Sequence, residues 1–155
     1  MRRRGNQAES PICHFVHRKE IAPECIWSVA ASTDYSWPAC WMVSQPNVLS
    51  LDDSAEWNAK APAWIRFDLG PSAPCISRIE LLPSMSAPGV AEHRIRIGMD
   101  VASMETVLII GGNCSHRKWL ECTLHQSRRT RFVEIHTLAA PKWTGWVRIR
   151  IWMEC

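Results

Sequence analysis

The chain has 155 residues, of which 46% are hydrophobic and 21% are charged, and its formal net charge is +3. This length and apolar content suffice for one domain with its own core. No segment approaches the roughly 20 consecutive apolar residues that a membrane-spanning helix requires. So small a net charge argues against dedicated nucleic-acid binding, which relies on a strongly basic surface. We therefore expect one soluble domain.

The first 24 residues are predicted to form a basic arm, because arginines at positions 2–4 open it and no clear hydrophobic period precedes Cys25. Within it, HFVHRKEI (14–21) is compatible with a loose tail, a short strand or a short helix. The arm lacks the apolar stretch of roughly 7 to 15 residues that a secretory signal needs. We therefore expect a cytoplasmic protein whose seven cysteines are mostly buried thiols.

Residues 25–155 are predicted to form one β-rich domain. Apolar and polar residues alternate with a period of two, the pattern of half-buried strands, in five segments. These are AWIRFDL (63–69), ISRIELL (76–82), HRIRIGM (93–99), RFVEIH (131–136) and WVRIRIW (146–152). Glycines, prolines and polar residues at 70–72, 83–89, 111–113 and 141–145 predict turns between strands. The pattern favours an antiparallel sandwich of about eight strands in two sheets.

Seven segments, in chain order, carry a resemblance to a known family. They are ASTDYSW (31–37), NVLSLDDSAEW (47–57), PAWIRFDLG (62–70), CISRIELLP (75–83), HRIRIGMD (93–100), TRFVEI (130–135) and W-x-G-x-x-R-I-R-I-W (143–152). Together they resemble the discoidin domain, the factor V/factor VIII C-type domain of the galactose-binding-like superfamily. The resemblance covers residues 25–155 and implies an all-β jelly roll that binds glycans, lipid head groups or proteins through its loops. Cys25 and Cys155 match positions that extracellular members often join by a disulfide, and whether they pair here is left open.

No catalytic motif accompanies this pattern. The hydrolase elbow, the phosphate-binding loop, the dinucleotide fingerprint and the H-E-x-x-H zinc helix are all absent from the sequence. We therefore expect a protein that is not an enzyme and that holds no cofactor.

The densest group of potential metal ligands is Cys114, His116, Cys122 and His125. Strand alternation, however, places Cys122 and His125 on opposite faces, which favours a core cysteine and a surface histidine. The calcium ligands of sugar-binding discoidin relatives do not match either. Their Asp-Gly falls on Ser50-Leu51, and their glutamate falls on Arg150, or on Arg148 if the register is shifted. The positive charge of either arginine would repel a cation. We expect no bound metal.

Two candidate binding surfaces emerge. The first is the loop after the opening ASTDYSW segment, which is unusually apolar for a loop and where we expect a contact site at Asp34, Tyr35, Trp37, Trp41 and Met42. The alternative is that individual tryptophans of this loop fold back into the core. The second is a cationic patch that Arg94 and Arg96 would form with Arg148 and Arg150 if their strands are neighbours. Alternating arginines can equally well only solvate an outer face.

Three functions follow from these surfaces. The first is an intracellular protein-interaction subunit of a larger assembly, cytoskeletal or ciliary, whose partner has an acidic surface. The alternative is a carbohydrate-binding module in which Tyr35, Trp37 or Trp41 stacks on a sugar. The third is peripheral binding to an anionic membrane through the same loop. The exposure of Trp37, Trp41, Trp143 and Trp146 would locate the contact surface.

Overall fold

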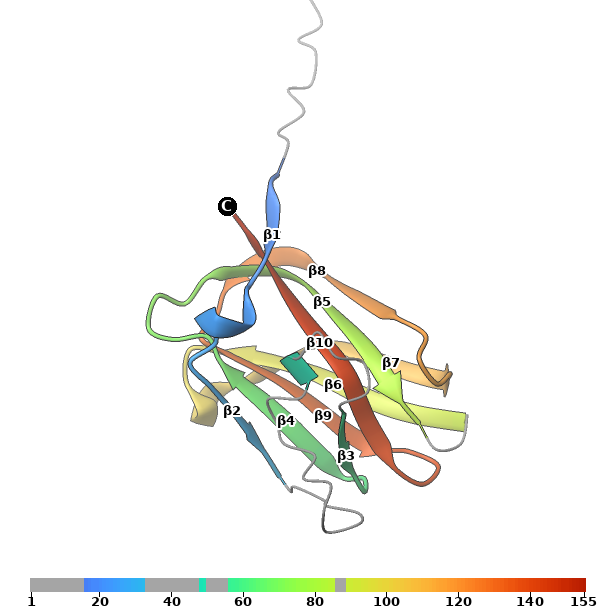
Figure 1. Ribbon diagram of the computed structural model, residues 1–155. Coiled ribbons are helices and arrows are strands. Elements are labelled where there is room, and N and C mark those ends of the chain that lie inside the picture. The colour runs from blue at the N-terminus through green and yellow to red at the C-terminus, as the bar shows by residue number, and fades with distance from the viewer. Residues whose placement is uncertain (1–15, 33–47, 50–55, 86–88) are drawn as a thin grey trace, which may run out of the picture.

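The computed structural model describes residues 16–32, 48–49, 56–85 and 89–155, which form two antiparallel sheets (Figure 1). The first sheet has the order β1-β10-β5-β8, with β3 also pairing with β10, and the second has the order β2-β4-β9-β6-β7. The ten strands are β1 (Arg18–Glu20), β2 (Ser28–Ala31), β3 (Trp57–Ala59), β4 (Ala63–Asp68), β5 (Cys75–Ser84), β6 (Gly89–Gly98), β7 (Glu105–Cys114), β8 (Leu120–Arg129), β9 (Phe132–Ala139) and β10 (Thr144–Glu154). The predicted antiparallel sandwich is confirmed.

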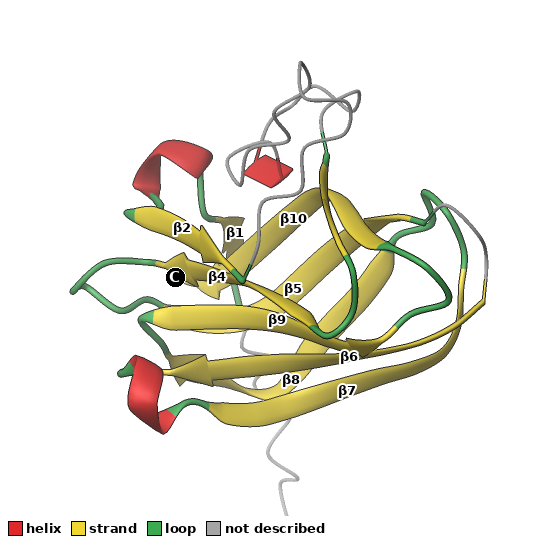
Figure 2. Cartoon of the chain, turned by 90° about the horizontal axis from the view of Figure 1, so that it is seen from below, coloured by secondary structure: helices red, strands yellow, loops and turns green. Residues whose placement is uncertain are grey.

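The core lies between the two sheets, which stack face to face in Figure 2. The period of two has the predicted result in β4, where Ile65 and Phe67 are fully buried while Arg66 and Asp68 face outward. The same alternation recurs in β6 and β10. Among the described side chains, Trp57 and Trp146 are the largest that are fully buried. Burial of this apolar surface from both sheets is the main driving force for the fold.

The turn predicted at residues 111–113 is wrong. Gly111, Gly112 and Asn113 lie within β7, opposite Glu92, Ala91 and Val90 of β6. Gly112 has a φ of 111°, which only glycine adopts readily, but its pairing with β6 continues. Turn-forming residues are tolerated here because β7 is the last strand of its sheet.

The amino-terminal segment contributes to the sandwich. Residues 18–20 form β1, which pairs with the end of β10, and Ile21 is buried with its N–H donating to the Ile151 carbonyl at 2.8 Å. Of the options for residues 14–21, a short strand is therefore correct at 18–20. The division of the chain into an arm and a domain at residue 24 stays a prediction.

Both ends of the described chain meet on one side of the sandwich (Figure 1). The Cys155 N–H donates to the His17 carbonyl at 3.0 Å. Cys25, in the 3-10 turn Pro23–Cys25, and Cys155 are both exposed free thiols, so the two do not form a disulfide in this structure. Helical structure in the described residues is limited to short 3-10 turns, and none of it is long and apolar enough to cross a membrane.

Candidate binding surfaces

The predicted contact loop falls outside the described residues, and with it Asp34, Tyr35, Trp37, Trp41 and Met42. What is described is the point from which residues 33–47 continue, the end of β2. There the Ser32 N–H donates to the Trp64 carbonyl at 2.9 Å, and the Trp64 N–H donates to Ser32 Oγ at 2.9 Å. This reciprocal pair fixes the end of β2 against β4.

Two half-buried indoles lie at this end of the sandwich, Trp64 on β4 and Trp143 immediately before β10. The Arg66 guanidinium stacks over Trp64 at 4.4 Å from the ring centroid, and Lys60 Nζ lies 5.1 Å from the centroid of Trp143. Each contact is a cation–π interaction that holds a cation over an aromatic face. Trp146, by contrast, is completely buried and belongs to the core. Of the two tryptophans proposed as markers here, only Trp143 reaches the surface.

The predicted single patch of four arginines does not exist. Arg94 and Arg96 lie on β6 and Arg148 and Arg150 lie on β10, and these strands belong to different sheets. Their outward side chains therefore lie on opposite faces of the sandwich. The sequence prediction failed because alternation gives the face within a strand but not the sheet to which the strand belongs.

On the outer face of the second sheet, the arginines surround acidic groups. Glu134 is only 1% exposed. One of its carboxylate oxygens forms an ion pair with Arg66 and the other forms one with Arg96, each at 2.7 Å. Arg94 pairs with Glu92 of its own strand at 3.0 Å. Glu134 compensates one of the two guanidinium charges that flank it, and Glu92 compensates the charge of Arg94, so these arginines do not form a free cationic surface.

The outer face of the first sheet has the same character. Arg150 lies 3.6 Å from Glu80 and 3.8 Å from Glu20, and its guanidinium stacks over Trp119 at 4.7 Å. Arg78 pairs with Glu80 and stands 5.9 Å from the Trp152 ring centroid. Arg150 is thus held in a network with acids on β5 and β1, which favours a structural role on a solvated face.

The buried pair of His93 and Cys114 resembles a catalytic cysteine with its histidine base, but the thiol is not activated. His93 Nε2 lies 3.8 Å from Cys114 Sγ, while His93 Nδ1 lies 2.8 Å from Thr137 Oγ1. Burial lowers the pKa of His93 to about 4 and raises the pKa of the Cys114 thiol. A reactive cysteine needs the opposite change, a lowered thiol pKa beside a basic imidazole. The cluster is a polar network within the core, in which the His93 ring also packs edge-to-face against Trp146.

The structure also separates the ligands of the predicted metal candidate. Cys122 is buried in the core, where burial raises its thiol pKa to about 12, whereas His125 is exposed on the opposite face of β8. The described residues contain no group of three His, Cys, Asp or Glu side chains that could hold a metal ion.

Sequence reasoning missed an exposed indole at the other end of β2. Trp27 is 67% exposed, yet its ring lies directly against the backbone at Gly70, where a Cβ would stand 2.6 Å from Trp27 Nε1. The Gly70 N–H donates to Asp68 Oδ1, and Arg131 donates to both oxygens of Asp68 at 3.0 Å. The indole is thus packed beside a bidentate ion pair. The only sequence signal was an aromatic residue just before a strand.

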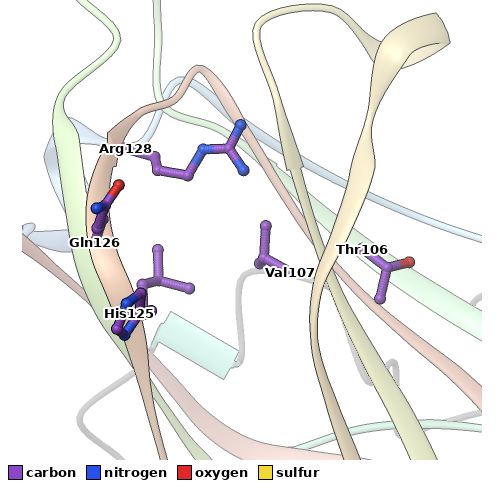
Figure 3. A pocket seen from close by; sticks show the side chains of 6 residues that line it. Thr106, Val107, His125, Gln126 and Arg128 are labelled. Carbon is purple, nitrogen blue, oxygen red and sulfur yellow. The ribbon is translucent and has the colours of Figure 1, made fainter.

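A hollow of about 240 Å³ opens between β7 and β8, which are edge strands of the two different sheets (Figure 3). Val107 and Arg128 point into it, and Leu124, His125 and Gln126 line the β8 side. Arg128 also crosses to Glu105 at the start of β7. The described residues that line the hollow supply one guanidinium, which is already paired with Glu105, and no convergent acid and base.

Comparison with family models and with curated proteins gives no match. Solved structures do match. A truncated AlyQ with family 32 carbohydrate-binding and alginate lyase domains is 18% identical with a TM-score of 0.73, over 90% of this chain and 34% of that one. The family 32 carbohydrate-binding module of C. perfringens NanJ, solved with galactose, is 12% identical with a TM-score of 0.70, over 88% and 99%.

A factor V/VIII type C domain from Bacteroides fragilis is 11% identical with a TM-score of 0.71, over 88% of this chain and 97% of that one. This chain spans about a third of the AlyQ protein but nearly the whole of the two single-domain structures. The chain therefore has the discoidin, galactose-binding-like fold, as its sequence predicted.

Proposed function

We propose that this chain is a carbohydrate-binding module that holds a sugar without transforming it. The observation that carries the proposal is the fold: the same sandwich, over 88% of this chain, forms the NanJ module that was solved with galactose. The sequence alternative, sugar binding, is thus better supported than the protein-interaction function that the sequence ranked first.

The aromatic residues predicted in the loop supply suitable chemistry. An indole or phenol ring presents a flat apolar face to the C–H groups of a pyranose, and nearby polar side chains then hold its hydroxyls. We assign this role to Tyr35, Trp37 or Trp41. Trp64 on β4 and Trp143 immediately before β10 lie at the end from which residues 33–47 continue. Because a cation already covers a face of each ring, we assign them to the flank of the site.

The test is a glycan array followed by titration calorimetry with the best glycan and with galactose. Trp37→Ala is expected to abolish binding, and Trp27→Ala, which removes an exposed indole at the other end of β2, is the matched control. Far-UV circular dichroism of both variants checks that they fold. Loss of binding in Trp27→Ala alone would move the site to the Asp68–Arg131 end. A chain that binds no glycan at all would refute the function.

The protein-interaction function stays a prediction, together with its acidic partner, its cytoskeletal or ciliary assembly and its cytoplasmic location. One of its arguments is weakened, because Arg94, Arg96 and Arg150 already have acidic neighbours. Membrane attachment through the loop also stays a prediction. Sedimentation with liposomes of phosphatidylcholine, with and without phosphatidylserine, separates it from sugar binding.

A further inference from the structure

Exposed hydrophobic side chains gather at the end of the second sheet where β2 begins and β6 ends. They are Trp27, just before β2, and Met99 and Val101, just after β6, and they are 67%, 52% and 40% exposed. Figure 2 shows the two 3-10 turns that adjoin them, Pro23–Cys25 and Val101–Ser103, at this same end of the sheet. Large apolar side chains that collect on a surface usually mark a place of contact with another molecule.

The Trp27 indole is held in place from one side. A Cβ at Gly70 would stand 2.6 Å from Nε1, 2.7 Å from Cδ1 and 2.9 Å from Cε2, which all belong to the five-membered ring. The Gly70 backbone therefore covers one face of the indole, and its exposed surface is the other face. The main-chain N–H of Trp27 also donates to the Asp68 carbonyl at 2.8 Å. A ring fixed in this way binds a partner at little cost in conformational entropy.

The other surface tryptophans of the described chain each have a cation over the ring. The pairs are Lys60 with Trp143, Arg66 with Trp64, Arg78 with Trp152 and Arg150 with Trp119, between 4.4 and 5.9 Å from the ring centroids. Within the described residues no cation occupies this position over Trp27. The most exposed indole is therefore the one whose face is left free for a cation from elsewhere.

The charges beside Trp27 that remain available are acidic. Glu24 is exposed, and in the described part of the chain it has no ion pair. Asp100 is exposed as well, at the other side of the row of strand ends. Arg131 lies between them, but it is already neutralised by Asp68, and Arg129 belongs to the other sheet. A free aromatic face flanked by carboxylates favours a basic ligand.

We propose that the Trp27 surface, made of Glu24, Trp27, Met99, Asp100 and Val101, binds a basic peptide segment of another protein. An arginine or lysine of that segment stacks on the open face of Trp27, as the chain's own cations do on its other surface indoles. The two acids attract its basic residues, and the exposed apolar side chains cover its apolar ones. The proposal does not rest on glycan binding, because this surface and the predicted loop lie at opposite ends of β2.

The test is an NMR titration of the isotope-labelled full chain with the peptide acetyl-Arg-Leu-Arg-Leu-Arg-amide. The indole N–H signal of Trp27 is expected to shift and saturate, whereas those of Trp64 and Trp119 stay in place. The same peptide with citrulline for arginine, which has the same shape without the charge, is expected to bind roughly 5- to 30-fold more weakly. Trp27→Leu, which keeps an apolar side chain but has no aromatic face, is expected to raise the dissociation constant by a similar factor.

Two further variants separate the ring from the charges. Trp119→Ala is the matched control, because Arg150 already covers that ring, and it is expected to leave the dissociation constant unchanged. Asp100→Asn retains the hydrogen bond from the Ala102 N–H, so the turn is kept. Combined with Glu24→Gln, it is expected to weaken binding and to reduce its dependence on salt. Unchanged thermal midpoints show that the variants fold.

Four results would overturn the proposal. The first two are equal binding of the citrulline peptide and equal loss in Trp119→Ala. The third is the absence of any saturable shift at Trp27. The fourth is tighter binding after alanine replaces Arg2, Arg3 and Arg4, because the chain's own amino-terminal arginines would then be the occupant of the surface.

Discussion

We expect mild acid to destabilise this protein through one side chain, His93. The imidazole is 1% exposed and contacts Thr137, Cys114 and Trp146, with no acid among these contacts. Burial lowers its pKa to about 4, because a charged imidazolium would lose its hydration there. In the unfolded chain a histidine has a pKa of about 6.5.

The sign and the size of the effect follow from these two pKa values. Between pH 6.5 and 4 the unfolded chain binds a proton at this position and the folded chain does not, so protons favour unfolding. The stability that the protein gains by keeping His93 neutral is fully present above about pH 6.5 and is lost as the pH falls to about 4. The two pKa values differ by about 2.5, and a difference of one corresponds to about 1.4 kcal/mol. Acidification to about pH 4 therefore lowers the free energy of unfolding by about 3 kcal/mol. That is a large share of the 5–15 kcal/mol typical of a domain of this kind.

The assay is urea unfolding followed by tryptophan fluorescence at several pH values between 7.5 and 4.5, for the natural chain and for His93→Gln. Glutamine can still hydrogen-bond to Thr137 but does not titrate in this range. The variant is expected to be less stable at pH 7.5, because its contact with Trp146 changes, but to lose less stability on acidification. Parallel loss in the two proteins would refute the assignment to His93.

Two further predictions concern the turn and the buried ion pair. Gly70→Ala is expected to lower the free energy of unfolding by at least about 1–2 kcal/mol, because Gly70 has a φ of 82° and an added Cβ would strike Trp27. Gly111→Ala, in open space, is its control, and urea unfolding measures both. Glu134→Gln is expected to cost about 1–3 kcal/mol, because it removes the buried charge that joins two guanidinium groups. An unchanged urea midpoint for this variant would contradict that role.

The sequence predicted the strands that have one solvent-exposed face and one buried face. β4 and β6 are clear cases, since Ile65, Phe67, Ile95 and Ile97 mark the core side of each strand. It left β1 open among three options and missed β3, because three residues are too few to display a period. It also mistook glycines inside β7 for a turn, because glycine favours turns and is equally acceptable on an edge strand.

The binding surfaces were harder to predict, because they depend on which strands become neighbours. The alternation of Arg94 and Arg150 with apolar residues correctly placed both on outer faces, but only the strand order separates them into two sheets. The burial of Glu134 was equally hidden, since it requires arginines from β4 and β6 to flank β9. The exposure of Trp27 depends on its packing over a glycine about 40 residues further along the chain.

The hydrogen bond between His17 and Cys155 has a consequence for circular permutation, in which the chain is closed at one point and opened at another. Because these two positions are hydrogen-bonded neighbours, a short flexible linker could join residue 155 to residue 16 without pulling any strand out of register. Fresh termini could then be opened at a surface turn such as the one after Gly70. Circular permutants of this type would carry a fused reporter at the turn after Gly70, which leads into β5 beside the end of β10, with the interior packing unchanged.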